Sequence, residues 1–271
     1  MNQAAPVAQQ PASAGSSPTV ILAVHAVSKV FGGLKAVDSV SFDVKTGQVF
    51  TMIGPNGAGK TTLFNILTGV YRPSSGEIVF QGQSIGGQPP HKVTKLGIAR
   101  TFQNIRLFGY LPAVENVMVG RHCRMHAKLW DSMFTSPLAR NEEKAVRARA
   151  MEEMEFVGVA RFAEDLARNL SYGDQRRLEI ARALASDPAL LLLDEPAAGL
   201  NPAEKAALGK LIHKIRDRGT TVFLIEHDMK VVMGISDEIV VLDHGAKIAE
   251  GAPAVVRADR QVIEAYLGKG A

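Results

Sequence analysis

One segment of the chain reads Gly54-Pro55-Asn56-Gly57-Ala58-Gly59-Lys60-Thr61-Thr62 and fits the pattern G-x-x-x-x-G-K-S/T. The apolar run Val49–Ile53 before it predicts a buried strand, and Thr61 to Gly69 after it predicts a helix. A strand, a glycine turn and a helix N-terminus direct several backbone N–H groups at one point, where the helix dipole adds positive potential. The segment therefore predicts a binding site for a di- or triphosphate; the alternative is a glycine-rich turn without a ligand.

Several side chains have the chemistry that such a site needs. Lys60 would neutralise the β and γ phosphates, and the Thr61 hydroxyl would ligate Mg²⁺. The apolar run Leu190–Leu193 predicts a buried parallel strand, and ligands bind at the carboxyl end of such strands. Asp194 lies at that end, so we expect it to reach the metal, often through water.

Three further residues are candidates for the hydrolysis of the nucleotide. Glu195 would position or deprotonate the water that attacks the γ-phosphate. His227 ends the next predicted strand and would hydrogen-bond that phosphate or the water, although a satisfied histidine at a strand end is the alternative. Gln103 ends the extended segment that begins at Ile98 and would contact the metal or the water. Asp194 and Glu195 could instead be a strand-end Asp and a capping Glu.

Phe31 lies at the edge of the strand-rich start of the chain. It would stack on an adenine ring, and a core aromatic residue beside a turn is the alternative. A second cluster, within Arg121–Leu138, contains the metal-capable residues His122, Cys123 and His126 together with Trp130. Its spacing fits no common zinc pattern, so no metal is expected there.

Composition limits the classes of function. The chain has 271 residues, enough for one large α/β domain or a domain plus a smaller lobe. The net charge is +4, but Lys and Arg are spread along the chain, so no nucleic-acid partner is expected. The single cysteine excludes an intrachain disulfide and favours a reducing compartment. No apolar run approaches the ~18–20 residues of a membrane span.

Taken together, these motifs resemble one family, the ATP-binding subunits of ABC transporters. The resemblance covers roughly Ile21 to Gly268 and rests on Gly54–Thr62, Gln103, Leu170-Ser171-Tyr172-Gly173, Leu190–Glu195, Ala197–Asn201 and His227, in order and spacing. It implies ATP and Mg²⁺ as cofactors and a head-to-tail dimer, homo- or heteromeric. In that dimer, Ser171 and Gly173 of one subunit would contact the ATP held by the phosphate-binding segment Gly54–Thr62, the P-loop, of the other.

The resemblance also implies a fold. We expect an α/β P-loop NTPase core with a mixed sheet and an antiparallel β subdomain, plus an inserted α-helical subdomain. The core would span residues 20–101 and 171–250, the helical subdomain about 102–170, and C-terminal helices 251–268. A long amphipathic helix is expected from Gln175 to Ser186. Residues 1–19 carry no charged side chain and lack the pattern of a signal peptide, which predicts a disordered tail.

The sequence departs from the family pattern at three positions. The signature motif of the family is Leu170–Gly173 here, and Tyr172 stands where it usually has glycine. Asp174 stands where glutamine is common, and Asn201 where aspartate is usual. None of these changes removes a phosphate ligand or the proposed base, so hydrolysis is expected to survive.

A finer resemblance points to branched-chain amino-acid importers, and within them to the larger, LivG-type ATPase subunit. It rests on Arg100–Phe108, Leu170–Gly173, Asp194–Pro202, Ile225–Gly234 and Ile263–Gly268. It implies transmembrane permease subunits as partners, a solute-binding protein indirectly, and a place on the cytoplasmic face of the membrane. ATPases for urea or short-amide import and for lipopolysaccharide export are close alternatives. A soluble ABC ATPase is less favoured, because the chain has one P-loop, one signature and no coiled-coil or zinc insert.

Overall fold

The computed structural model describes residues 19–124 and 137–267. Residues 1–18 of the expected tail, His126, Trp130 and the last residue of the expected C-terminal helices, Gly268, lie outside the described residues.

The central element is a six-stranded sheet in the order β10-β9-β3-β8-β7-β6. Its strands are β3 (Val49–Ile53), β6 (Ile98–Arg100), β7 (Leu190–Asp194), β8 (Thr221–Ile225), β9 (Glu238–Asp243) and β10 (Ala246–Gly251). All neighbours pair in parallel except β10, which is antiparallel to β9. Strands β3, β7 and β8 are buried at every position, which explains their continuous apolar sequences.

A second, antiparallel sheet has the order β2-β1-β4-β5. Its strands are β1 (Val20–Phe31), β2 (Leu34–Lys45), β4 (Ser75–Phe80) and β5 (Gln83–Ser84). Aromatic rings join this sheet to the central one: Phe42 of β2 stacks on Phe50 at 5.4 Å between ring centroids. Phe223 of β8 meets Phe64 of helix α1 (Lys60–Leu67) at 4.9 Å. The helix that follows the phosphate-binding segment is therefore fixed in a core shared by both sheets.

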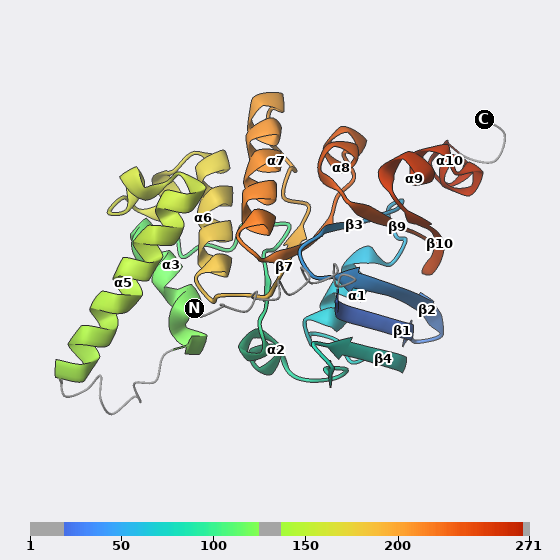
Figure 1. Ribbon diagram of the computed structural model, residues 1–271, viewed down its shortest axis with the longest axis horizontal. Helices are drawn as coiled ribbons and strands as arrows, with labels where there is room; N and C mark the ends of the chain where they lie inside the picture. Colours follow the sequence, from blue (N-terminus) through green and yellow to red (C-terminus); the bar gives the residue numbers. More distant parts are fainter. Residues whose placement is uncertain (1–18, 125–136, 268–271) are drawn as a thin grey trace, which may run out of the picture.

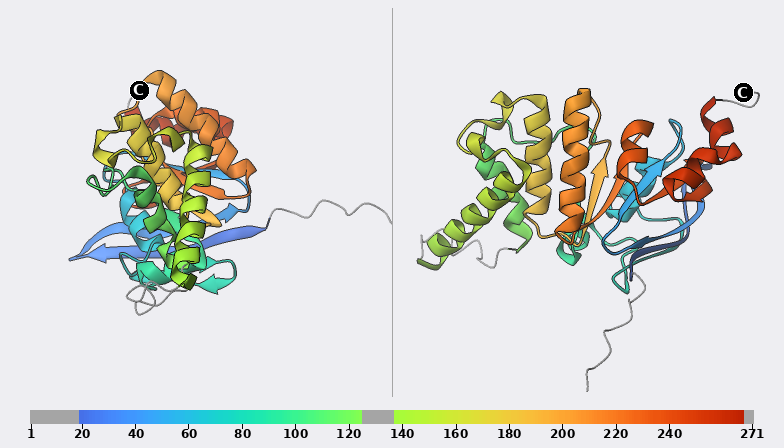
Figure 2. Two further views of the ribbon diagram at one scale, coloured as in Figure 1. Left: turned by 90° about the vertical axis from the view of Figure 1, so that its left-hand side faces the viewer. Right: turned by 45° about the horizontal axis from the view of Figure 1, so that its top comes forward.

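The remaining helices surround the central sheet (Figure 1). They are α2 (Pro90–Leu96), α3 (Ala113–Arg121), α5 (Pro137–Val157), α6 (Tyr172–Leu184), α7 (Pro202–Asp217), α8 (Met229–Ile235), α9 (Pro253–Ala258) and α10 (Arg260–Leu267), with 3-10 turns η1 (His122–Arg124), η2 (Ala160–Phe162) and η3 (Ala167–Asn169). Helices α3, α5 and α6 pack together at the end of the molecule away from the antiparallel sheet (Figures 1 and 2). The predicted α/β fold, with a mixed sheet, an antiparallel sheet and inserted helices, is confirmed.

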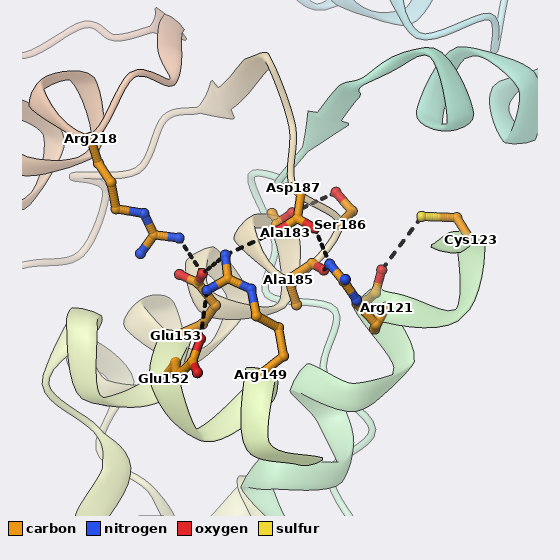
Figure 3. Close-up of polar contacts among 11 residues, drawn as sticks. Arg121, Cys123, Arg149, Glu152, Glu153, Ala183, Ala185, Ser186, Asp187 and Arg218 are labelled. Carbon is orange, nitrogen blue, oxygen red and sulfur yellow. Dashed lines mark hydrogen bonds and ion pairs between the residues drawn. The ribbon is translucent and has the colours of Figure 1, made fainter. Parts of the chain in front are cut away.

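Charged side chains connect the inserted helices to the rest of the chain (Figure 3). Glu153 of α5 is fully buried and pairs with Arg149 of its own helix, at 2.5 Å, and with Arg218 at the end of α7. Asp187, after α6, receives Arg149 at 2.9 Å and also Arg121 of α3. Burial alone would raise the pKa of Asp187, but hydrogen bonds from Arg121 and Arg149 outweigh it and lower that pKa. One network thus joins α3, α5, α7 and the turn after α6.

Among residues 19–124 and 137–267, no helix combines the length and the apolar character needed to cross a bilayer.

Candidate active site

The phosphate-binding segment connects β3 to α1 and passes very close to neighbouring backbone. Gly54 has φ +151°, and a Cβ there would lie 2.1 Å from the carbonyl oxygen of Leu242. Gly59 has φ +98°, and its Cβ would lie 2.3 Å from the carbonyl oxygen of Ala36. Only glycine fits either position. Gly59 is also the N-cap of α1 and supplies no side-chain cap, so the first N–H groups of that helix are left for an anion.

Lys60 lies folded against its own loop. Its Nζ donates to the carbonyl oxygens of Gly54, at 2.6 Å, and Pro55, at 2.9 Å. Burial lowers the pKa of Lys60, while the nearby carboxylates of Glu195 and Asp194 oppose that shift.

A cavity of about 510 Å³ lies over this loop. Its lining combines the loop, a facing segment of β2 and the ends of more distant strands: Leu34, Lys35, Ala36, Asn56, Gly57, Ala58, Gly59, Lys60, Thr61, Thr62, Gln103, Glu195 and His244. Most of the predicted phosphate, metal and catalytic residues therefore meet at one place. Gly54 and Pro55 are not in this lining and contact it through Lys60.

Glu195 is contacted by the two other candidates for hydrolysis. Gln103 donates through Nε2 to Glu195 Oε2 at 3.0 Å. His227 Nδ1 lies 3.5 Å from the same oxygen, and the histidine side chain is 59% exposed. Glu195 itself has φ +47°, and its N–H donates to Ile225, the last residue of β8, at 3.0 Å. The structure thus brings together three side chains that come from three separate segments.

Asp194 is placed differently from Glu195. Its carboxylate is buried and pairs with Arg100 Nη2 at 2.7 Å, and Asp194 is not among the residues that line the cavity. Arg100 also donates to Asn65 Oδ1 of α1 at 2.7 Å and to Oγ1 of Thr68, the C-cap of α1, at 3.2 Å. Sequence reasoning missed this role of Arg100; its only signal was a cation within the predicted extended segment Ile98–Gln103.

Phe31, the predicted adenine-stacking residue, also lies outside the lining of this cavity. Its ring packs edge-on against Tyr71, with centroids 5.3 Å apart, and Lys29 Nζ lies 4.9 Å from its centroid. Phe31 is 41% exposed and is absent from the cavity lining, so this arrangement matches neither a core aromatic residue nor an adenine platform directly over the loop.

Ser171 and Gly173 form a separate surface at the start of α6. The Ser171 Oγ donates to Asp174 Oδ2 at 2.7 Å and accepts from the Asp174 N–H at 3.2 Å, so Ser171 caps the helix. Gly173 lies against Glu204, whose Oε1 would be 2.9 Å from a Cβ. Neither residue lines the cavity at the P-loop. The two predicted phosphate-binding surfaces therefore lie at different places on the chain.

Buried charges support the loop that carries Gln103, and sequence reasoning missed them. Arg176 of α6 is 1% exposed and donates to the carbonyl oxygens of Phe102 and Gln103, both at 2.8 Å. Glu179, one turn later, accepts from the N–H groups of Phe102 and Arg106 at 3.4 and 3.3 Å. Burial raises the pKa of Glu179, and Arg176 opposes that shift. Opposite charges three residues apart on a largely apolar helix face were the available signal.

Glu226 is a third buried charge that was not singled out. It precedes His227 and is fully buried. Its carboxylate accepts from the N–H groups of Ala197 at 2.7 Å, His227 at 3.1 Å and Asp228 at 3.5 Å. Burial raises the pKa of Glu226, and these backbone hydrogen bonds oppose the shift. The side chain therefore joins the segment after β7 to the segment after β8.

Known proteins share this sequence and fold. Residues 37–198 match the family described as ABC transporter, and residues 246–271 match the family described as branched-chain amino acid ATP-binding cassette transporter. The chain is 49% identical over 250 residues to the high-affinity branched-chain amino acid transport ATP-binding protein BraF of Pseudomonas aeruginosa, covering 92% of this chain and 98% of that protein. It is 44% identical to the corresponding LivG protein of Escherichia coli, with the same coverage.

Solved structures agree with these relatives. An ATP-binding cassette of an ABC transporter in its ADP conformation has a TM-score of 0.81 and 32% identity, and covers 93% of this chain and 100% of that one. A dimeric bacterial ABC transporter cassette has a TM-score of 0.73 and 27% identity, and covers 86% of this chain and 98% of that one. These matches confirm the family resemblance seen in the sequence. The chain belongs to the ABC transporter family, as one of its ATP-binding, ATP-hydrolysing subunits.

Proposed function

We propose that this chain hydrolyses ATP to power the import of branched-chain or related amino acids through a membrane permease. The observation that carries the hydrolytic part is the single cavity at which Lys60, Gln103 and Glu195 meet. The relatives BraF and LivG, whose names describe branched-chain amino acid transport, support the choice of solute. Urea or short-amide import and lipopolysaccharide export are the alternatives for the solute.

The residues around the cavity fit a magnesium nucleotide. Gly54 and Gly59 allow the backbone to approach phosphates where a Cβ would collide with neighbouring carbonyls. Mg²⁺ would be held by the Thr61 hydroxyl and the Gln103 amide oxygen, with Asp194 acting through water, and would neutralise phosphate charge. Lys60 would exchange its loop carbonyls for phosphate oxygens.

Glu195 is the base in this proposal. Gln103 donates to Glu195 Oε2 and His227 Nδ1 lies 3.5 Å from the same oxygen, so the carboxylate would be oriented before water arrives. Glu195 would then accept the proton of the attacking water, and His227 would hydrogen-bond the γ-phosphate.

A second ATP-binding subunit would complete the site. Ser171 and Gly173 lie away from the cavity, at the N-terminus of a 13-residue helix. A head-to-tail neighbour would bring these residues to the nucleotide. The similar bacterial ABC transporter cassette, whose solved structure is dimeric, supports this arrangement.

The permease would dock on a groove of about 720 Å³ among α2, α3 and α6. The groove includes the exposed apolar residues Phe108, 51% exposed, and Val119, 45% exposed, beside the loop that begins at Gln103. Docking there would place the subunit on the cytoplasmic face of the membrane, and would connect the permease to Gln103, with a solute-binding protein acting indirectly.

Two substitutions test the site. Glu195→Gln should leave ATP binding intact and give an ATP-stabilised dimer with little turnover; unimpaired hydrolysis would contradict the base. Lys60→Ala should reduce ATP affinity and hydrolysis together, and unchanged turnover would contradict the phosphate site.

For the solute, the complex reconstituted with its permease should hydrolyse ATP faster with leucine, isoleucine or valine, whereas a response to urea alone would favour the alternative.

A further inference from the structure

Tyr172, the first residue of α6, occupies space beside the segment that follows Glu195. Gly199 in that segment has φ +76°, and a Cβ there would lie 3.0 Å from Tyr172 Cε1 and 3.4 Å from Cζ. The tyrosine ring therefore lies directly against the backbone of Gly199. A smaller residue at position 172 would leave this contact unmade.

The hydroxyl of the same side chain contacts a different segment. Tyr172 Oη accepts a hydrogen bond from Arg176 Nη2 at 3.0 Å. That nitrogen also donates to the carbonyl oxygen of Gln103 at 2.8 Å, and Nη1 donates to that of Phe102. Because the guanidinium is almost fully buried, each of its few partners helps to fix its position.

Both contacts lead to Glu195, one through a hydrogen bond to its side chain and one through its backbone. Gln103 donates to the Glu195 carboxylate at 3.0 Å. Two overlapping turns follow Glu195: the Ala198 N–H donates to the Glu195 carbonyl oxygen at 3.2 Å, and the Leu200 N–H donates to that of Ala197 at 3.3 Å, in the turn that contains Gly199. Tyr172 thus contacts the segment after the proposed base directly and reaches the Gln103 loop only through Arg176 of its own helix, and it does not line the cavity itself.

We infer that Tyr172 is a positioning residue, which holds Gln103 through Arg176 and holds Gly199 directly, so that Glu195 is aligned for hydrolysis. The inference rests on the proposed function. Tyr172 is 46% exposed and stands between Ser171 and Gly173. Contact of a nucleotide or a neighbouring subunit with that surface would therefore shift Tyr172, and with it both supports of Glu195.

Steady-state ATP hydrolysis by the full-length subunit tests this role. Tyr172→Phe keeps the ring on Gly199 but removes the acceptor for Arg176, so kcat should fall by about three- to ten-fold, as for one lost hydrogen bond. KM for ATP and the melting temperature should stay close to the wild-type values. Tyr172→Gly removes both contacts and should lower kcat further. Tyr110→Phe is the matched control, because Tyr110 is 78% exposed with Arg168 over its ring at 4.4 Å; it should keep the wild-type kcat.

A double-mutant cycle isolates the ring contact. Gly199→Ala introduces a Cβ at positive φ, which strains the backbone in any background. Beside the Tyr172 ring the Cβ also collides, so Gly199→Ala should lower kcat more in the wild type than in the Tyr172→Gly background. Equal losses in the two backgrounds would show that the ring contact does not matter.

The outcomes separate the inference from the proposed function. If the wild type hydrolyses ATP and both Tyr172 variants keep kcat within about twofold, which is below the value of one hydrogen bond, the inference is wrong and the function stands. Loss of kcat only in proportion to loss of folded protein would also overturn it, because the role would then be structural. If the wild type hydrolyses no ATP, the proposed function fails first.

Discussion

Arg100 and Asp194 form a buried ion pair at the carboxyl edge of the central sheet, with Nη2 and Oδ2 2.7 Å apart and the side chains 7% and 4% exposed. Their strands, β6 and β7, pair in parallel with Arg100 opposite Leu192, two residues before Asp194. Arg100 also bonds Asn65 of α1 and Thr68 just after it. The pair thus connects the helix that starts at the P-loop to the strand that leads to Glu195.

Replacing Arg100 should therefore destabilise the protein strongly. Arg100→Met keeps much of the side-chain volume but leaves the Asp194 carboxylate buried without its partner, and we expect the free energy of unfolding to fall by about 3–5 kcal/mol. Denaturant unfolding measures this value. Arg260→Met is the control, because Arg260 pairs with Glu264 on the surface and is 91% exposed; it should cost less than about 0.5 kcal/mol. Similar losses for both variants would contradict the role of the buried pair.

Glu226 should make stability depend on pH in a defined direction. Burial raises its pKa in the folded state above the ordinary value of 4.5. Between these two pKa values the folded protein binds a proton that the unfolded chain has released, so the contribution of Glu226 to stability falls as pH rises through that window.

Glu226→Gln removes this titration. We expect the difference in unfolding free energy between wild type and variant to change from pH 4.5 upward. The unfolding free energy of the wild type should fall relative to that of the variant as the pH rises. Two curves that stay parallel across the whole range would contradict the raised pKa.

The strands of the core were predictable because a strand that is buried on both faces has a continuous run of apolar residues. Val49–Ile53 reads as a continuous apolar run and coincides with β3, which is buried at every position. The predicted strand at Leu190 likewise coincides with β7. The phosphate-binding segment was predictable for a related reason, since its glycines are required by close backbone approaches.

Helix α6 begins at Tyr172 rather than at the predicted Gln175, because Ser171 caps it through the Asp174 N–H; this signal is local, and the prediction did not use it. Other features depend on contacts between residues that are far apart in the sequence. The extended segment predicted from Ile98 to Gln103 is a strand only as far as Arg100, and beyond it the chain is held by Arg176. Arg100 and Asp194 are 94 positions apart, so no spacing rule brings them together.

Glu153 provides a test of the network in Figure 3. It is fully buried between Arg149 and Arg218, and Glu153→Ala should reduce the free energy of unfolding by roughly 3 kcal/mol because two cations lose their buried partner. The preceding residue, Glu152, also pairs with Arg149 but is 63% exposed. Glu152→Ala should cost less than about 1 kcal/mol. Chemical denaturation measures the unfolding free energy of both variants. An equal loss in the two variants would show that the buried network does not stabilise the packing of the helices on the core.

Phe108 tests the proposed docking groove. Its backbone is fixed by the buried Asn116, which accepts from the Phe108 N–H at 2.8 Å and donates to its carbonyl oxygen at 3.1 Å. The ring is nevertheless 51% exposed, so it is presented at the surface on a rigid support. An aromatic side chain held in this way is typical of a residue that contributes much of the binding energy at an interface.

Phe108→Asp places a charge at that point and should weaken co-purification with the permease subunits by at least about tenfold, the effect of losing one strong interface contact. Tyr110→Asp introduces the same charge two residues away, at a side chain that does not line the groove, and should leave co-purification intact. Because both variants change surface charge equally, a difference between them reports on the groove. If both variants bind the permease as the wild type does, the docking surface lies elsewhere on the subunit.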